Sequence, residues 1–250
     1  MPTDQRVELE ELLRVRSSSQ FLSGLSTPHI KQLAEFATLK LFAARTLIYR
    51  QGEPPEACLL VLEGLLKLYE LSDGGHQTTL MFISAGQFVG GQAMVEHRSN
   101  LFSAESVETA RALVWSGPDL RTLMERIPHL AWNAYEMTYE RLQEFAQRWR
   151  ELVTDHVEQR IARALIRLAQ QLGKDNGREL VIPGRMFGQD LAGYAGTTLF
   201  TVSRVLNRWE RQGIIRHRRT FLALQDLNAL REIAKTGFLD DRPSQAVSNG

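Results

Sequence analysis

The segment from residue 189 to residue 213 constrains the fold more than any other part of this 250-residue chain. Leu191, Ala192 and Ala195 recur at helical spacing, and Gly196 follows where a tight turn favours a residue without a Cβ atom. Beyond the turn, apolar residues again recur three and four positions apart, at Val202, Val205, Leu206 and Trp209. The spacing predicts two short helices joined by a turn, which is a helix-turn-helix.

The second of these helices is expected to begin beside Thr198, whose hydroxyl can accept a hydrogen bond from an unpaired backbone N–H. Its outward face carries side chains that can reach base edges or phosphates in the major groove of DNA, namely Thr201, Arg204, Arg208 and Arg211. We assign Arg204 to a guanine. The alternative is an ordinary helical hairpin whose arginines form a solvated face.

Short strands predicted on both sides of the hairpin favour the DNA-binding interpretation. Residues 179–183 predict one strand before it, and residues 213–224 predict two strands after it. Three arginines and a histidine in residues 216–219 suit contact with phosphates. The segment is therefore predicted to be a winged helix. Its expected DNA-contacting residues are Gln189, Thr197, Thr198, Leu199, Phe200, Thr201, Ser203, Arg204, Arg208, Arg218 and Arg219.

The charge is divided between the two parts of the chain. Residues 1–155 contain 15 Lys and Arg against 20 Asp and Glu, a net −5. Residues 156–250 contain 15 against 9, a net +6, which leaves the whole chain at +1. A chain of this length can form two modest domains, and the C-terminal one is suited to bind a polyanion.

Membrane and metal partners are not expected. The chain has no run of about 18 apolar residues, and its polar start lacks the apolar core of a signal peptide, which favours a cytoplasmic location. Cys58 is the single cysteine, so it cannot form an internal disulfide or hold a zinc or iron–sulfur site alone. It lies in the apolar run 57–62, where a buried small hydrophobe is favoured over a redox sensor.

Short apolar runs separated by glycine-containing turns fill the first half of the chain. They lie at residues 46–49, 58–62, 65–71, 78–83, 101–107 and 111–115. Many short strands with such separators predict a β-barrel or a jelly roll. A helix is expected between about residues 21 and 40, with Pro28 in its first turn. Residues 1–20 are expected to be a flexible lead-in.

An unbroken helical pattern extends from Pro128 to Asp155. One side of it forms a heptad seam, on which the expected dimer-interface residues are Tyr135, Thr138, Leu142, Phe145, Trp149 and Leu152. A parallel homodimer is favoured over packing on the barrel, and two recognition helices one DNA turn apart would then read an inverted repeat. Asp155 is expected to cap the following helix, residues 156–172, and to act as a hinge.

Together, residues 21–225 resemble the cAMP receptor protein/FNR (Crp/Fnr) family of bacterial transcription regulators. The motifs that carry the resemblance are Tyr49-Arg-Gln-Gly-Glu53, Glu63-Gly64, Gly86-Gln-Phe-Val-Gly90, Val157-Glu-Gln-Arg-Ile-Ala162 and Thr201-Val-Ser-Arg204. The resemblance implies an α+β fold with an N-terminal β-roll (a double-stranded β-helix, like a cyclic-nucleotide-binding domain), a long dimerisation helix and a C-terminal winged helix-turn-helix. It also implies a homodimer that recruits or blocks RNA polymerase, and a regulator rather than an enzyme.

The implied organisation has five parts. They are a flexible segment at 1–20, the sensor roll at 21–127, the dimerisation helix with its hinge at 128–155, the DNA-binding domain at 156–235 and a flexible tail at 236–250.

In members of the family that bind cyclic AMP, a Gly-Glu pair binds the ribose and an Arg-Ser pair binds the cyclic phosphate. The expected effector pocket here comprises Gly90, Gly91, Phe102, Ser103, Glu144 and Phe145.

The matching pairs, Gly90-Gly91 and Phe102-Ser103, lack both the carboxylate and the guanidinium. A cyclic phosphate without its guanidinium loses a charge-assisted hydrogen bond worth about 1.5–3 kcal/mol, so cyclic AMP binding is expected to be weak or absent. The oxygen-sensing FNR branch holds its cluster with several N-terminal cysteines, and none precedes Cys58. That sensor is therefore excluded as well.

The recognition helix resembles one branch of the family. Phe200 stands where relatives commonly have Glu, and a phenylalanine can contact a thymine methyl but cannot accept from cytosine N4. The Leu-aromatic-Thr-Val-Ser-Arg pattern of residues 199–204 resembles nitric-oxide-responsive regulators, whose sites resemble TTG…CAA. That branch implies haem in the roll. The candidate ligands are His29, His76, His97 and His129, and for each the competing interpretation is a histidine without a ligand role.

Three alternatives stay open at this stage. A cyclic-nucleotide-responsive regulator or an effector-independent one would keep the same DNA-binding domain. A cupin-like metalloenzyme would need clustered His and Glu ligands, and the roll has no His-X-His pair. The sequence leaves the cofactor and the effector unidentified.

Overall fold

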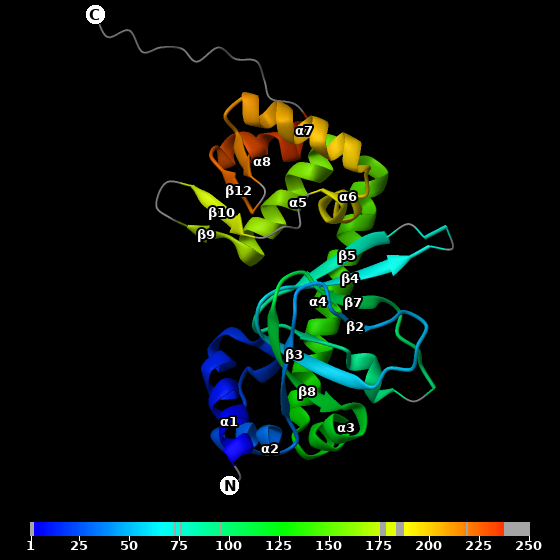
Figure 1. Ribbon diagram of the computed structural model, residues 1–250, viewed down its shortest axis with the longest axis vertical. Coiled ribbons are helices and arrows are strands. Elements are labelled where there is room, and N and C mark those ends of the chain that lie inside the picture. Colours follow the sequence, from blue (N-terminus) through cyan, green and yellow to red (C-terminus); the bar gives the residue numbers. More distant parts are fainter. Residues whose placement is uncertain are drawn as a thin grey trace, which may run out of the picture.

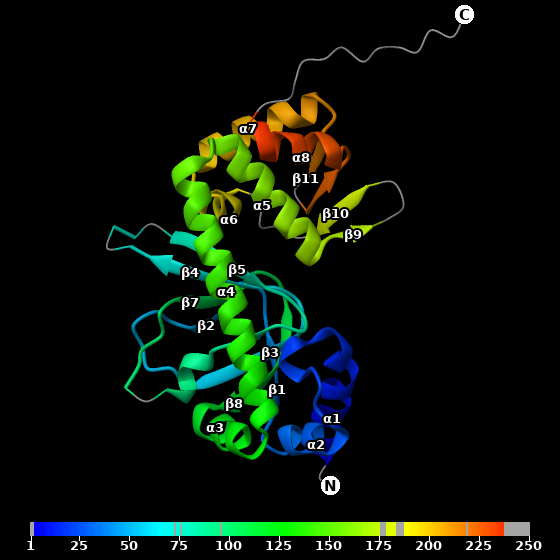
Figure 2. The ribbon, with the colours of Figure 1, turned by 180° about the vertical axis from the view of Figure 1, so that it is seen from behind.

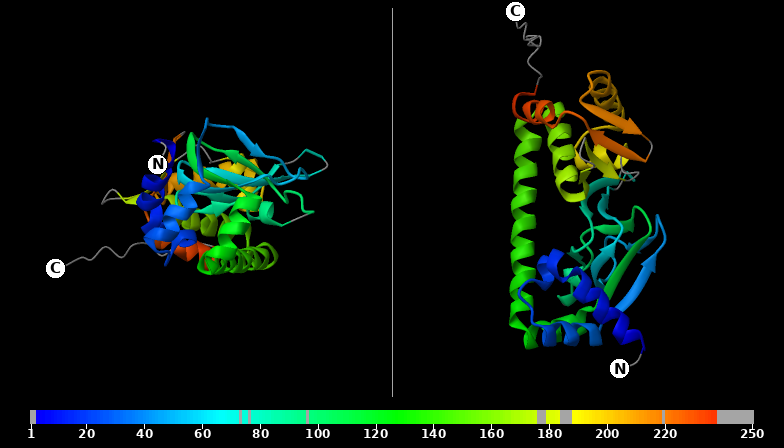
Figure 3. Two further views of the ribbon diagram at one scale, coloured as in Figure 1. Left: turned by 90° about the horizontal axis from the view of Figure 1, so that it is seen from below. Right: turned by 90° about the vertical axis from the view of Figure 1, so that its left-hand side faces the viewer.

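The protein is elongated, with a β-roll at one end, a smaller mixed domain at the other and one long helix beside both (Figures 1 and 2). This computed structural model describes residues 3–72, 74–75, 77–95, 97–175, 179–183, 188–218 and 220–237, so most of the predicted tail lies outside the described residues. The long helix, α4 (Pro128–Thr154), forms one side of the molecule, as Figure 3 shows. The predicted α+β architecture is confirmed.

Two four-stranded sheets form the roll, with strand orders β1-β8-β3-β6 and β2-β7-β4-β5. The strands are β1 (Thr38–Phe42), β2 (Leu47–Tyr49), β3 (Ala57–Glu63), β4 (Leu66–Leu71), β5 (Gln77–Ile83), β6 (Phe88–Val89), β7 (Ser103–Ser106) and β8 (Ala110–Ser116). Successive side chains of a strand point to opposite faces, so Leu59 and Val61 lie between the sheets while Leu60 and Leu62 lie under the surrounding helices. The roll therefore has an inner and an outer apolar core.

The helix predicted between about residues 21 and 40 is present with Pro28 in its first turn, but it ends before residue 40. The structure has helix α2 (Thr27–Glu35) and then strand β1, which pairs antiparallel with β8. Ser26 caps α2 by accepting a hydrogen bond from the backbone N–H of His29. The helix was predicted too far because β1 pairs with a strand about 70 residues further along the chain, and the spacing of neighbouring residues does not indicate such a partner.

Residues 3–15 form a helix, α1 (Thr3–Val15), where we expected a flexible lead-in. Leu12 and Val15 lie three positions apart and are buried in the outer core beside Trp115. Arg111 of β8 donates to the carboxylate of Glu11 at 2.6 Å, which ties the helix to the roll. The expectation was wrong because the apolar side of this helix is narrow and its partner surface comes from distant strands. Two short turns follow it, η1 (Arg16–Ser18) and η2 (Gln20–Leu22).

A helical domain with a small sheet occupies the C-terminal end. Its sheet order is β11-β12-β10-β9, and its elements are α5 (Val157–Leu172), β9 (Lys174–Asp175), β10 (Leu180–Pro183), α6 (Gln189–Tyr194), α7 (Leu199–Arg211), β11 (Ile215–Arg218), β12 (Phe221–Leu224) and α8 (Leu227–Thr236). Ile161 and Leu165 of α5 are buried against Trp209 of α7 in one core. The strands predicted around the hairpin are confirmed by β10, β11 and β12.

Asp155 does not cap the helix that follows it. His156 is the N-cap of α5, and the side chain of Gln159 accepts from the backbone N–H of His156 at 2.8 Å. Asp155 instead ends α4, where its N–H donates to the carbonyl oxygen of Glu151 at 3.0 Å. Its carboxylate lies 2.8 Å from the guanidinium of Arg163. The residue is therefore the C-cap of α4, with extended backbone and an ion pair to α5, and not the N-cap of α5.

The roll contacts the C-terminal domain through strands β4 and β5, which reach α6 at the junction visible in Figure 1. Lys67 Nζ of β4 lies 3.0 Å from Asp190 Oδ1 of α6. The hydroxyl of Thr79 on β5 donates to the same oxygen at 3.0 Å. Arg148 of α4 donates to the backbone oxygen of Tyr194 at 2.9 Å, and its guanidinium lies 4.2 Å from the centre of that ring. These contacts hold the two domains in one arrangement.

We expect the Lys67–Asp190 pair to show a coupling free energy of about 1–3 kcal/mol in a double-mutant cycle. Lys67 is buried, so its charge needs a carboxylate partner. In the Asp190→Ala variant, the remaining partner of Lys67 is the carboxylate of Glu105, 3.3 Å away. The cycle uses Lys67→Met, Asp190→Ala and the double variant, compared by urea unfolding. Strictly additive effects would contradict a direct interaction between the domains at this point.

Cys58 is expected to be unreactive in the folded protein. Its thiol is buried and donates to the carbonyl oxygen of Gly90 at 3.3 Å. Burial raises the pKa of the Cys58 thiol to about 12, so the thiolate is scarce at neutral pH. Iodoacetamide should label the native chain about a hundredfold or more slowly than the urea-unfolded chain. Equal labelling rates would restore the redox-sensor alternative.

Candidate nucleic-acid interface and effector pocket

The helix-turn-helix consists of α6 and α7, joined by Gly196 in a left-handed conformation with φ +62°. A Cβ atom on this glycine would also collide with the side chain of Leu152 on α4. Thr198 is the N-cap of α7, and its hydroxyl accepts from the backbone N–H of Thr201 at 3.2 Å. The predicted turn, cap and helix start are therefore confirmed.

The two faces of α7 differ sharply. Its inner face is buried in the core of the C-terminal domain, through Val202, Val205, Leu206 and Trp209. Its outer face and start are exposed, and Phe200 is 75% exposed although it is a large apolar side chain. Most of the residues expected to contact DNA lie on this exposed part of the domain: Gln189, Thr198, Leu199, Phe200, Ser203 and Arg204 are exposed, and Thr197 and Thr201 are half-buried.

The arginines of α7 are in different environments. Arg208 forms an ion pair with Glu158 of α5, which its position on the helix surface did not indicate. Arg211 donates to the backbone oxygen of Asn207 in its own last turn. We find no ion pair of Arg204 within the part of the chain that the structure describes. Arg204 is therefore the arginine of this face that is most readily placed against a base edge.

The wing contains β11 and β12. Arg218 at the end of β11 lies 2.7 Å from the carboxylate of Glu210, which also accepts from the backbone N–H of His217. Burial opposes ionisation of Glu210, but the hydrogen bonds from His217 and Arg218 hold its pKa below the ordinary value. Arg216 pairs with Glu179, and Arg219 lies outside the described residues. The wing thus presents Arg218 on an exposed edge of the DNA-binding domain.

Aromatic side chains occupy the expected effector pocket. Phe102 and Phe145 both pack against the inner core of the roll. Ser103 is buried, and its hydroxyl oxygen accepts from the backbone N–H of Gln51 at 3.0 Å. Glu144 lies 3.4 Å from the hydroxyl of Tyr194, at the junction with α6. Of the six predicted residues, the two phenylalanines therefore belong to the packing of the inner core, and Glu144 belongs to the junction with α6.

The two glycines predicted for that pocket, Gly90 and Gly91, lie in different local backbone structures. Gly90 has φ +89°, and a Cβ atom there would collide with the backbone oxygen of Ala57. Gly91 begins a short turn, η3 (Gly91–Met94).

Sequence reasoning missed Arg141 of α4, whose guanidinium donates to the carbonyl oxygen of Phe88 beside these glycines. Burial lowers the pKa of Arg141. No local pattern marks this residue, because the spacing of α4 does not show which side chains enter the roll.

The outer side of α4 presents an apolar face. Trp149 is 70% exposed and Leu142 63%, and the exposed large apolar residues of this helix are Trp132, Tyr135, Tyr139, Leu142, Trp149, Leu152 and Val153. Thr138 is also exposed, and its hydroxyl donates to the backbone oxygen of Ala134. Phe145 differs from the other predicted seam residues because it turns towards the roll. Helix α4 itself runs along the side of the molecule that is seen in Figure 2.

The described histidines do not fit a haem in the roll. His29 lies on α2, and His129 lies at the start of α4 beside Gly24, both in the outer layer of helices. His97 follows η3 in a loop with φ +54°, and His76 lies outside the described residues. Among the residues that the structure describes, no three His, Cys, Asp or Glu side chains gather as metal ligands.

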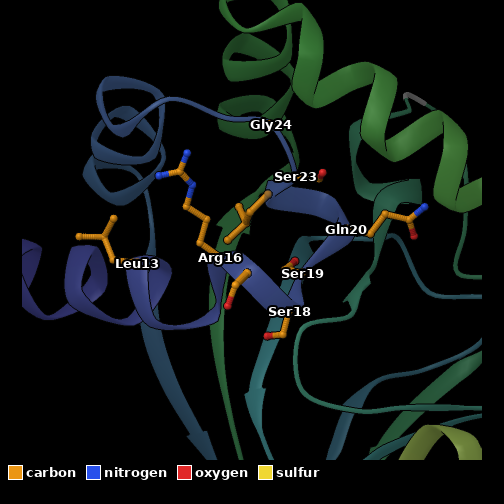
Figure 4. A pocket seen from close by; sticks show the side chains of 9 residues that line it. Leu13, Arg16, Ser18, Ser19, Gln20, Ser23 and Gly24 are labelled. Atoms are coloured by element: carbon orange, nitrogen blue, oxygen red, sulfur yellow. The ribbon is translucent and has the colours of Figure 1, made fainter.

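A hollow of about 490 Å³ lies beside α1, and Figure 4 shows the hydroxyl-rich segment that lines it. Arg16 donates to the backbone oxygen of Leu25, and Ser18 donates to that of Val15 at 3.1 Å. These bonds stabilise the connection from α1 to α2. The lining contains none of the residues expected to contact DNA or an effector.

A roll of the sensor type, a long helix with an exposed apolar face and an exposed winged helix-turn-helix define a two-domain DNA-binding regulator. Residues 39–127 match the cyclic nucleotide-binding domain, and residues 159–233 match the Crp-like helix-turn-helix domain. The chain belongs to the Crp/Fnr family of DNA-binding transcription regulators, whose members work as dimers on DNA. We find no helix among the described residues with the length and apolar character needed to cross a bilayer.

Known relatives align over most of their length. The chain is 27% identical to a cyclic AMP receptor protein of Thermus thermophilus over 216 residues, which is 86% of this chain and 97% of the relative. It is 23% identical to the nitrogen fixation regulation protein FixK of Bradyrhizobium diazoefficiens over 79% of this chain and 82% of the relative. These relatives are regulators and not enzymes, so the cupin-like metalloenzyme has no support.

Two solved structures illustrate the similarity. A transcriptional regulator of the CRP/FNR family from Thermus thermophilus has a TM-score of 0.66 and 26% identity, covering 79% of this chain and 98% of that one. FixK2 from Bradyrhizobium japonicum has a TM-score of 0.68 and 22% identity, covering 83% of this chain and 99% of that one. The second similarity concerns the fold alone.

Proposed function

We propose that two copies of the chain associate through α4 and bind an inverted-repeat DNA site, under the control of an effector other than cyclic AMP. The observation that carries this proposal is the exposure of two surfaces on one molecule. These are the apolar face of α4 around Leu142 and Trp149, and the outer face of α7 around Phe200 and Arg204. A symmetric pair would present two such α7 helices to successive major grooves.

Each DNA contact has a proposed role. Arg204 reads a guanine, and Phe200 contacts a thymine methyl where an acidic residue would have accepted from cytosine. The N-terminal turn of α7 and Gln189 position the domain, and Arg218 with Arg219 of the wing contacts phosphates. Arg208 contributes to DNA only if its ion pair with Glu158 opens.

A gel-shift titration tests the proposal. The full chain is titrated against a duplex with the inverted repeat TTG…CAA and against the same duplex with both half-sites scrambled. We expect a single retarded complex of two chains per duplex, and at least a tenfold preference for the intact repeat at fixed salt, equivalent to about 1.4 kcal/mol. Equal affinity for both duplexes, or a complex with one chain, would overturn it.

Cyclic AMP is not the proposed effector. The guanidinium that relatives use is replaced by Phe102, which packs in the inner core, and Gly91 has no side chain to hold a ribose. Arg141 of α4 is half-buried, but it donates to a backbone oxygen of the roll. Isothermal titration of the full chain with cyclic AMP should show no saturable heat at micromolar nucleotide. Tight binding would overturn this assignment.

Nitric oxide sensing through haem is the finer hypothesis that the recognition helix suggests. The described histidines give it no pair of ligands inside the roll. Reconstitution of the purified protein with haem is the test. A Soret band from bound haem would support the hypothesis, and its absence would remove it.

We further propose that an effector acts on DNA binding through the junction of the roll with α6. The β4–β5 hairpin contacts Asp190, α4 contacts Tyr194 through Arg148, and Asp155 links α4 to α5. A change in the roll can therefore alter the angle of the DNA-binding domain about Asp155. The bound dimer would then recruit or block RNA polymerase, which transcription from the selected site with purified polymerase tests.

A further inference from the structure

Two of the arginines expected to contact DNA are paired with a carboxylate in the free protein. Arg208 of α7 pairs with Glu158 of α5, and Arg218 of β11 pairs with Glu210 of α7. We find no such pair for Arg204 within the described part of α7 and its neighbours. A carboxylate and a DNA phosphate are similar partners for a guanidinium, because both are anions with oxygen acceptors. Each of these carboxylates therefore occupies an arginine as a phosphate would.

The Arg208–Glu158 pair is the more enclosed of the two. The side chain of Arg208 is 43% exposed, against 57% for Arg218 at the end of its strand. The guanidinium nitrogen of Arg208 that contacts Glu158 is itself buried. A phosphate oxygen cannot reach this nitrogen while the pair is closed, whereas the more exposed Arg218 can still approach the DNA backbone.

Packing already holds α5 against α7 without this ion pair. Ile161 of α5 and Trp209 of α7 are buried in the same core. Arg160 of α5 also donates to the backbone oxygen of Ala195, in the turn of the helix-turn-helix, at 3.2 Å. A partly exposed ion pair adds little stability to such a contact. The charge of Glu158 therefore has its main consequence when DNA approaches.

The exchange of partners at Arg208 brings little net attraction. Glu158 lies in the first turn of α5, directly beside the guanidinium. If a phosphate replaces it, Arg208 exchanges one anion for another, and the released carboxylate stays close to the negatively charged backbone. A contact of this kind also releases fewer counterions than a contact made by an unpaired arginine.

We propose that Glu158 screens Arg208 from DNA phosphates and so limits the affinity of the chain for DNA of any sequence. The inference rests on the proposed function, in which the outer face of α7 enters the major groove. Phosphate contacts contribute equally to every sequence, and base contacts such as that of Arg204 do not depend on this pair. The screen therefore weakens binding to random sites and leaves base reading in place.

The test uses Glu158→Gln in the full chain and a fluorescent duplex of mixed sequence. Anisotropy titrations at several salt concentrations give the affinity and its salt dependence. At about 50 mM salt, the variant should bind about threefold or more tightly for each DNA-binding domain on the duplex. The slope of log affinity against log salt should steepen by about 0.9 for each domain. An unchanged affinity and slope would overturn the proposal.

Further variants show whether the effect passes through Arg208. Glu158→Ala should give the same gain as Glu158→Gln, and the double variant Glu158→Gln/Arg208→Gln should lose it. Glu232→Gln is the matched control, because it changes the net charge equally but removes a carboxylate that pairs with Lys235 within α8. Its affinity and slope should match those of the wild type. A gain in the control as large as that in Glu158→Gln, or a gain that persists in the double variant, would contradict the screen.

This test is separable from the test of DNA reading. The gel shift compares an intact repeat with a scrambled one, whereas the screen is measured between variants on one duplex of mixed sequence. A chain without preference for the repeat can still show the effect of Glu158, and a chain that reads the repeat can lack it. On the repeat, Glu158→Gln should keep the wild-type preference at the base pair assigned to Arg204. Loss of that preference would assign Glu158 to base reading and overturn the screen.

Discussion

The Leu142→Asp variant is expected to be monomeric at concentrations at which the wild-type chain is a dimer. Leu142 is 63% exposed in the middle of the apolar face of α4. In a symmetric dimer the change removes two buried leucines, each worth about 1.5–3 kcal/mol, and places two carboxylates in an apolar seam. The dissociation constant of the dimer should rise by about 10³-fold or more, as measured by sedimentation equilibrium.

Gln143→Asp is the matched control for this variant. Gln143 lies on the same turn of α4 and is exposed, but it is outside the heptad seam, so the dimer should persist. The fold of Leu142→Asp should also persist, because Leu130 and Met137 on the other side of α4 still pack against the roll. A variant that remains a dimer as tight as the wild type would show that another surface forms the interface.

The Arg204→Ala variant should lose about 1–3 kcal/mol per half-site on the cognate DNA, which is roughly 5- to 150-fold in affinity. The side chain lies on the exposed face of α7, and we find it in no ion pair within the described residues. Its loss should relax specificity at one base pair of each half-site and leave the other positions unchanged. Fluorescence anisotropy with single-base variants of the site measures both effects.

The Arg218→Ala variant on the wing is compared with Arg204→Ala, because Arg218 is expected to contact phosphates and Arg204 a base. It should weaken binding to cognate and random DNA alike, and lower the slope of log affinity against log salt by about 1 for each wing. Arg218 is paired with Glu210 in the free protein, which reduces but does not remove this effect. If both variants lost the same affinity on cognate and random DNA, the division between base-reading and phosphate-contacting residues would be contradicted.

Local patterns predicted the DNA-binding domain well. The turn at Gly196 and the cap at Thr198 depend on neighbours within a few residues, and the buried stripe of α7 follows from helical spacing. The continuous helix from Pro128 was predicted for the same reason, because no breaker interrupts its periodicity. In such segments, the residues that determine the local structure and most of the residues that they contact lie close together in the sequence.

Features that depend on distant partners were not predictable. Helix α1 is stable because Leu12 meets a surface of strands far along the chain, and Glu11 pairs with Arg111. Arg208 looked free on its helix but pairs with Glu158 of α5. Family positions likewise did not indicate that Phe102 and Phe145 pack against the inner core, or that Arg141 of α4 donates to the carbonyl oxygen of Phe88.

The most direct test of the central claim is selection of the full, ligand-free chain on a random pool of duplex DNA. A dimer with two exposed α7 helices should enrich an inverted repeat, with a G·C pair at the position of Arg204 in each half and half-sites one helical turn apart. Enrichment of that repeat would support a DNA-reading homodimer. Recovery of unselected sequences, or of single half-sites without symmetry, would contradict it.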